Sequence, residues 1–138
     1  MPEDAQRGTI LLVDDNAAIL GLAKRLLEMA GYAVITATDG REGLRFYAEH
    51  QSNIILLLTD VSMPNMGGLE LADHLLGIDS KLPVVFMSGD AWSAHRGLEC
   101  LAKPFRPGEL FEVVNRAVHR NDSLAARGKN GSLTVAVL

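Results

Sequence analysis

Five side chains able to do polar chemistry stand directly at the ends of apolar runs in this sequence. They are Asp14, Asp15, Asp60, Ser88 and Lys103. If they meet, a carboxylate beside a divalent cation, with a hydroxyl and an ammonium group directed at the same point, is suited to phosphoryl transfer. An aspartate can act as the nucleophile and form an aspartyl-phosphate, and positive charge stabilises the transferring oxygens. Each residue alone also has a plain interpretation as a turn residue, because Asp and Ser are common in turns.

The apolar run Ile54–Thr59 is the element on which this interpretation depends. It carries no charge, leads into Asp60 and is followed at once by a turn-forming segment over 64–68. A short apolar run bounded by turn residues is typical of a strand buried on both faces of a parallel sheet. Comparable runs predict four further strands, over Thr9–Val13, Ala33–Thr38, Leu82–Met87 and Leu98–Ala102.

Helices are predicted between these strands. Apolar residues at helical spacing place them over Ala17–Ala30, from about Arg41 to His50, from near Gly68, and from Pro107. Asn16 is a candidate N-cap, and Asp39 with Glu42 resembles a capping box. Strands that alternate with helices indicate a parallel sheet covered by helices on both faces. All carboxyl ends then lie on one edge, where ligands bind in open α/β sheets, so the five side chains are predicted to converge.

Three converging carboxylates require positive charge nearby. Two carboxylates about 4 Å apart repel by roughly 4 kcal/mol at an effective dielectric near 20. That repulsion is large beside the roughly 5–15 kcal/mol that stabilises a whole domain. Lys103 supplies one cation. Mg²⁺ (or Mn²⁺) is predicted to supply the rest, because Mg²⁺ binds oxygen ligands, keeps several waters and is often completed by phosphate oxygens.

Size and composition exclude several other classes of protein. The chain has 138 residues, enough for one domain, and a net charge of −4, which argues against a nucleic-acid surface. No apolar run approaches membrane-spanning length, and the polar N-terminus lacks an apolar signal core, so we expect a cytoplasmic protein. Cys100 is the only cysteine, which excludes an internal disulfide and a cysteine zinc site.

Four motifs in order resemble the receiver domain of a bacterial two-component response regulator. They are Val13-Asp14-Asp15, the segment from Asp60 to Gly68, Met87-Ser88-Gly89 and Lys103-Pro104-Phe105. The resemblance runs from about Thr9 to Arg120. It implies a flavodoxin-like, doubly wound five-stranded parallel sheet with strand order 2-1-3-4-5, an order that receivers share with flavodoxin.

The resemblance also implies roles for the acidic residues. Asp60 matches the phosphoacceptor, which would take a phosphoryl group from a histidine kinase or phosphotransfer protein. Asp15 matches the direct Mg²⁺ ligand and Asp14 its water-mediated neighbour. Asp60 itself and the backbone carbonyl of Ser62 would complete the protein ligands.

The remaining roles concern the other two strand ends. Ser88 matches the switch hydroxyl that turns toward the phosphoryl group, and Lys103 matches the lysine that contacts it. The bond before Pro104 would be cis, a form accessible mainly before proline. Cys100 stands at the switch-aromatic position, where the family usually has Tyr or Phe, and the simplest interpretation is a small buried hydrophobe.

Two further departures from the family pattern lie nearby. The interval from Ser88 to Lys103 is several residues shorter than usual, so the fourth helix, over 91–97, is predicted to be shortened or absent. Arg106 stands where a Ser or Thr N-cap is common, which predicts a weaker start for the last helix. Ser62 and Asp90 fall at positions that tune how fast the family loses its phosphoryl group.

The chain is predicted to divide into a disordered N-terminus over 1–8, a receiver domain over 9–120 and a linker with tail over 121–138. The end of the tail, Leu133–Leu138, has strand propensity. It could be a disordered end, the start of a further domain, or a strand that pairs with a sheet edge and supports a homodimer.

Three functions are compatible with part or all of this pattern. The first is a phosphorylation-dependent switch that acts through contact with a downstream protein and is no enzyme beyond self-catalysed phosphotransfer and autodephosphorylation. No direct nucleic-acid or membrane partner is expected. The second is a phosphate-independent receiver-like interaction module, supported by Cys100 and the short fourth helix. A haloacid-dehalogenase-like phosphatase is disfavoured, because the second Asp that it needs two residues after Asp14 is Asn16 here.

Overall fold

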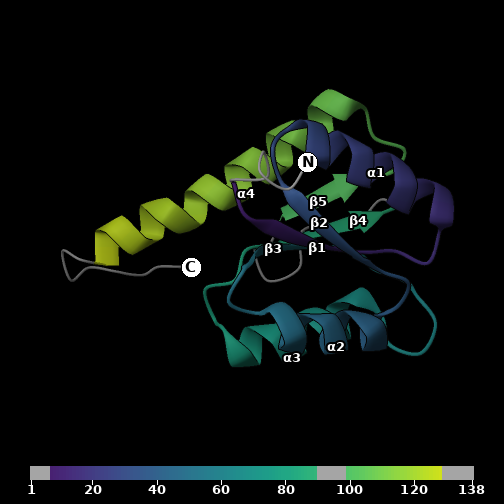
Figure 1. The fold of residues 1–138 in the computed structure, drawn as a ribbon, viewed down its shortest axis with the longest axis horizontal. Coiled ribbons are helices and arrows are strands. Elements are labelled where there is room, and N and C mark those ends of the chain that lie inside the picture. The colour runs from purple at the N-terminus through teal and green to yellow at the C-terminus, as the bar shows by residue number, and fades with distance from the viewer. Residues whose placement is uncertain (1–6, 90–98, 129–138) are drawn as a thin grey trace.

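The structure of the chain is a computed structural model that describes residues 7–89 and 99–128, with side chains described as far as His119. Strands and helices alternate through most of it (Figure 1). In chain order they are β1 (Thr9–Val13), α1 (Ala17–Met29), β2 (Ala33–Ala37), α2 (Gly40–His50), β3 (Ile54–Asp60), α3 (Gly68–Ile78), β4 (Val84–Ser88), β5 (Glu99–Ala102) and α4 (Pro107–Gly128).

The five strands form one parallel sheet in the order β2-β1-β3-β4-β5, as predicted. Each pair is parallel, with Val13 opposite Thr59 and Asp60 opposite Met87. β3, the central strand, therefore ends beside the ends of β1 and β4. Parallel strands with right-handed crossovers bring their carboxyl ends to one edge.

Alternating residues of the strands build two apolar layers, one on each face of the sheet. Helices α1 and α4 cover one face and α2 and α3 cover the other (Figure 1). Under α1 and α4, Leu12 and Leu58 pack with Leu27 and Val114. The opposite layer is built from the intervening strand residues and from apolar residues of α2 and α3. Its members include Leu11, Val13, Leu57, Phe86, Tyr47, Leu71 and Leu75. Burial on both faces explains why the strands read as continuous apolar runs.

The starts of α1 and α4 are held by side-chain hydrogen bonds. The Asn16 side-chain oxygen accepts hydrogen bonds from the backbone N–H groups of Ala18 and Ile19, at 2.9 and 3.1 Å. At the start of α4, Glu109 Oε1 accepts a hydrogen bond from Arg106 N–H at 2.7 Å. Arg106 cannot cap with its own side chain, but Glu109 reaches back and supplies half of a capping box, which supports the first turn.

The last helix is longer than predicted. α4 continues to Gly128, so residues 121–128 are helical where the sequence predicts a linker. The predictions for the N-terminus before Arg7, for the fourth helix over 91–97 and for the tail after Gly128 concern residues outside the described part of the chain. Among the described residues, no helix is long and apolar enough to cross a membrane.

Candidate functional site

Two acidic residues leave β1 side by side but differ in burial. Asp14 is completely buried, and its backbone N–H donates to the Ala37 carbonyl of β2 at 3.1 Å. Its Oδ1 accepts a hydrogen bond from Asn16 N–H at 2.9 Å, which turns the chain into α1. Asp15 is exposed. One carboxylate is thus fixed in the protein and the other faces solvent.

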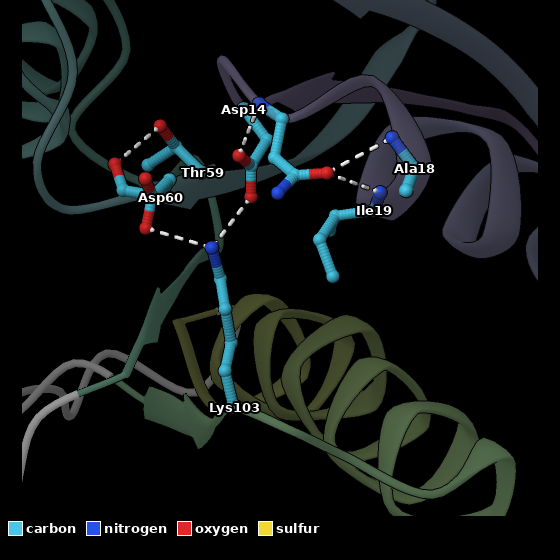
Figure 2. Close-up of polar contacts among 7 residues, drawn as sticks. Asp14, Ala18, Ile19, Thr59, Asp60 and Lys103 are labelled. Atoms are coloured by element: carbon cyan, nitrogen blue, oxygen red, sulfur yellow. Dashed lines mark hydrogen bonds and ion pairs between the residues drawn. The ribbon is translucent and has the colours of Figure 1, made fainter.

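Asp60 is the last residue of the central strand. Its residue exposure is 8%, so most of it is enclosed while part still meets solvent. The buried Thr59 hydroxyl donates a hydrogen bond to the Asp60 carbonyl oxygen at 3.0 Å (Figure 2). The backbone of Gly68 packs against the same carbonyl so closely that a Cβ atom there would collide with it. Asp60 therefore has a rigidly held backbone and a partly accessible carboxylate.

Lys103 joins the acidic residues of two strands. Figure 2 shows its side chain reaching between Asp14 and Asp60. Lys103 Nζ lies 2.8 Å from Asp14 Oδ2 and 3.1 Å from Asp60 Oδ1. Its backbone N–H donates to the Ser88 carbonyl at 2.8 Å. The Lys103–Pro104 peptide bond is cis, as the resemblance implied.

The three carboxylates form a compact group. Asp14, Asp15 and Asp60 each place one carboxylate oxygen within 4.8 Å of the others. Oxygens bound to the same Mg²⁺ at about 2.1 Å lie at most about 4.2 Å apart, so small side-chain movements bring this set into coordination distance. All three donors are hard oxygens, and one of the residues is open to solvent, which suits an ion that keeps several waters. The residues fit a magnesium ion.

The electrostatics of the cluster follow from its enclosure. Burial raises the pKa of the Asp60 carboxyl, the hydrogen bond with Lys103 opposes this, and the charges of Asp14 and Asp15 add to the rise. Burial disfavours the charged form of Lys103, yet its hydrogen bonds with Asp14 and Asp60 outweigh this and raise its pKa above the ordinary value. The ammonium group is therefore charged at neutral pH and partly balances the carboxylates.

The other predicted site residues lie at or near the same sheet edge. Ser88 is the last residue of β4, has 7% residue exposure and adjoins Met87, the register partner of Asp60. Ser62 is exposed and lies in the loop that follows β3. Their predicted roles, in switching and in cation binding, stay predictions.

Cys100 lies away from this edge, within β5. It pairs with Phe86 of β4 and packs, half-buried, against the apolar layer under α2 and α3. Burial raises the pKa of its thiol, which keeps it protonated and unreactive. This environment suits the interpretation of Cys100 as a small hydrophobe.

One contact beside the site was missed from the sequence. Asp39 was predicted only as a helix cap, and its Oδ1 does accept from Glu42 N–H at 2.9 Å. Its Oδ2 also accepts a hydrogen bond from the side-chain amide of Asn65 at 2.7 Å, across 26 residues. Asn65 has a φ of 69°, in the left-handed region, where Asn is enriched among non-glycine residues. The sequence indicates a turn at Asn65, but it does not indicate that Asp39 is the hydrogen-bond partner of Asn65.

Similarity to known proteins agrees with this geometry. Residues 10–115 match the family described as the response regulator receiver domain. The chain is 35% identical over 124 residues to the probable transcriptional regulator ycf27 of Guillardia theta, which covers 85% of this chain and 47% of that protein. It is 33% identical over 136 residues to the transcriptional regulatory protein PrrA of Mycobacterium tuberculosis, covering 94% and 57%. The chain thus spans about half the length of these curated relatives.

Solved structures with the same fold include receiver domains. The receiver domain of the hybrid histidine kinase CckA is 37% identical, with a TM-score of 0.72 over 80% of this chain and 99% of that one. A response regulator receiver domain protein from Clostridium thermocellum is 29% identical, with a TM-score of 0.74 over 85% and 98%.

Proposed function

Because the chain belongs to the response regulator receiver domain family, we propose that it is a phosphorylation-dependent signalling switch with Asp60 as the phosphoacceptor. The observation that carries the proposal is the position of the Asp60 carboxylate. It is partly accessible, lies 3.1 Å from the Lys103 ammonium group and shares a compact cluster with Asp14 and Asp15. This combination supports attack on phosphorus better than it supports a purely structural role.

The proposed reaction is a phosphoryl transfer from a partner's phosphohistidine. One Asp60 carboxylate oxygen attacks phosphorus, an O–P bond forms, the N–P bond breaks and the imidazole leaves with the electron pair. Lys103 lies within reach of the transferred oxygens, because its ammonium group already contacts Asp60 Oδ1. Hydrolysis of the acyl phosphate by water returns the free carboxylate and inorganic phosphate.

The chain's own residues define where a divalent cation would bind. The carboxylates of Asp14, Asp15 and Asp60 would hold it, with the backbone carbonyl of Ser62 as a further ligand. When bound, Mg²⁺ (or Mn²⁺) supplies positive charge that stabilises the phosphoryl oxygens. The Asp14 carboxylate is held by Asn16 and Lys103, so it keeps its position when a cation binds. The side chain of Asp15 faces solvent and is free to move toward the cation.

Signalling follows from the charge that phosphorylation adds. A phosphoryl group brings additional negative charge and strong acceptor oxygens to the sheet edge. Ser88, at the end of the neighbouring strand, is the group proposed to turn toward it and bias a two-state arrangement. A downstream protein would read that arrangement by contact, and a histidine kinase or phosphotransfer protein would donate the group. We place this activity in the cytoplasm.

Phosphorylation with a small phosphodonor, followed by intact mass, tests the proposal. Wild type should gain one phosphoryl group only when Mg²⁺ is present, because the cation stabilises the transferring oxygens. Asp60→Asn should gain none, since the amide is no nucleophile. Wild type that stays unmodified with Mg²⁺ would rule out this function in favour of a phosphate-independent interaction module. Asp60→Asn that is modified as fully as wild type would exclude Asp60 as the phosphoacceptor.

A further inference from the structure

The loop over residues 61–67 leaves the site at Asp60 and is closed at its base. Val61 N–H donates to the Met87 carbonyl of β4 at 3.1 Å, and Gly68 N–H returns to the Val61 carbonyl at 2.9 Å. These two bonds fix where the loop begins and where α3 starts. They do not by themselves fix the direction in which the far end of the loop extends.

A second pair of contacts fixes the far end. Gly40 N–H, at the start of α2, donates to the Met66 carbonyl at 3.0 Å, and the Asn65 amide donates to Asp39 Oδ2 at 2.7 Å. The two backbones approach so closely that a Cβ atom on Gly40 would lie 2.5 Å from the Met66 carbonyl oxygen. The loop after Asp60 is therefore attached at its tip to the β2–α2 junction.

Asp39 is suited to hold this tip because it uses both carboxylate oxygens in different directions. Oδ1 is fixed by Glu42 N–H at 2.9 Å, which sets the rotamer, and Oδ2 is then presented to Asn65. Hydrogen bonds to an ionised acceptor are stronger than those between neutral groups. The lowered pKa of Asp39, caused first by the Glu42 N–H and then by the Asn65 amide, keeps that acceptor charged.

We propose that Asp39 and Asn65 form a positioning pair that holds the loop over 61–67 in the geometry required for divalent-cation binding beside Asp60. The inference rests on the proposed function, in which the Ser62 carbonyl of this loop is a cation ligand. Neither residue of the pair belongs to the carboxylate cluster of Asp14, Asp15 and Asp60. The pair acts through the loop backbone, because Mg²⁺ demands near-ideal octahedral geometry at about 2.1 Å and tolerates little displacement of a ligand.

Two substitutions remove the contact while keeping the local backbone. Asn65→Gly deletes the amide, and glycine adopts the φ of 69° without strain. Asp39→Ser keeps a side-chain acceptor for the α2 N-terminus, since Ser and Asp are comparable N-caps, but has no second oxygen for Asn65. Arg116→Gln is the matched control, because it removes an exposed ion pair with Glu99 at 3.1 Å that lies between β5 and α4.

Calorimetric titration of the unphosphorylated protein with Mg²⁺ measures the effect of these substitutions on Mg²⁺ affinity. Loss of a partner that orients a metal ligand weakens metal affinity by about tenfold or more. We therefore expect the Mg²⁺ dissociation constant to rise by about tenfold in Asn65→Gly and in Asp39→Ser. The double variant should be no weaker than either single one, because both remove the same contact. Arg116→Gln should bind Mg²⁺ like wild type.

Amide hydrogen exchange without any divalent cation gives a second readout. The Gly40 amide, which donates to Met66, should exchange faster in both single variants, while the Gly68 amide at the base of the loop should keep its protection. Variants that bind Mg²⁺ as tightly as wild type, while wild type binds Mg²⁺ and is phosphorylated on Asp60, would overturn the positioning pair alone. Wild type that binds no Mg²⁺ would overturn the pair and the proposed function together.

Discussion

Lys103 sets the electrostatic balance of the site at the scale of single residues. Its ammonium group is hydrogen-bonded to completely buried Asp14 and also contacts Asp60. A buried carboxylate without a partner would be costly, because removing one member of a buried pair leaves an uncompensated charge. Lys103 therefore gives the buried Asp14 carboxylate a hydrogen-bonded positive partner within the protein interior.

Asp39 makes stability depend on pH. The hydrogen bonds from Glu42 N–H and Asn65 lower its pKa below the ordinary value of 3.8. Since the folded pKa is the lower one, the contribution is fully present above the unfolded pKa and is lost as the pH falls through the folded pKa.

We expect the difference in free energy of unfolding between wild type and Asp39→Ser to be constant from about pH 7 to about pH 5 and to shrink below about pH 4. Urea denaturation across this range measures it. A difference that stays constant down to about pH 2 would contradict the assignment of the lowered pKa to Asp39.

Sequence alone located the carboxylate cluster but not the contact at the tip of the loop. An apolar run precedes each of Asp14, Asp15, Asp60 and Lys103. Because the carboxyl ends of parallel strands meet at one edge of the sheet, the positions of these residues after the runs are sufficient to predict the cluster. The Asp39–Asn65 contact depends on a left-handed residue that turns the loop back toward another helix. Such a long-range pairing of two turn residues leaves no periodic signal in the sequence.

At the scale of elements, the junction between β3 and α3 depends on close backbone contact. Gly68 begins α3 directly against the Asp60 carbonyl and the Thr59 side chain. Gly77 lies in the same helix and is exposed, and outside its chain neighbours and the backbone of its own helix no atom lies within 4 Å of the place where a Cβ would stand. The two glycines allow a matched comparison within one helix.

Gly68→Ala should lower the free energy of unfolding by about 1–3 kcal/mol, because the added methyl group forces β3 and α3 apart. It should also slow phosphorylation of Asp60. Gly77→Ala should raise stability by about 0.5–1 kcal/mol, because Ala is the better helix former. Denaturant unfolding measures both, and a Gly68→Ala variant as stable as wild type would be inconsistent with the tight contact.

Strand and helix positions followed from the apolar pattern, but one helix end did not. The polar residues after Arg120, together with Gly128, favoured a linker, whereas α4 extends to Gly128. Leu124, Ala125 and Ala126 have high intrinsic helix propensity, and a helix already begun extends at little cost. Helix propensity alone can therefore extend α4 beyond Arg120, and it leaves no apolar periodicity in the sequence from which the extension could be predicted.

For the whole molecule, cation binding and folding should be linked. Two of the carboxylates directly follow β1 and the third ends β3, so a cation joins elements that are separate in the unfolded chain. Mg²⁺ at about a hundred times its dissociation constant should raise the free energy of unfolding by roughly 2.7 kcal/mol.

Asp15→Ala should remove most of that increase while changing the metal-free stability little, because Asp15 is exposed. Thermal unfolding with and without Mg²⁺ provides the measurement, with Ca²⁺-free and chelator-treated samples as controls. An undiminished increase in Asp15→Ala would show that the ion binds elsewhere.

The length of α4 has a mechanical consequence for the molecule. The helix has 22 residues, and at 1.5 Å per residue it is about 33 Å long. Its first turn follows Lys103 and the cis bond closely along the chain, and Figure 1 shows its far end projecting beyond the sheet. A tilt of about 10° at that first turn would carry the tip by about 6 Å. A rearrangement of less than an ångström around the Lys103 ammonium group would thus produce a much larger displacement at the far end of α4, large enough for another protein to detect.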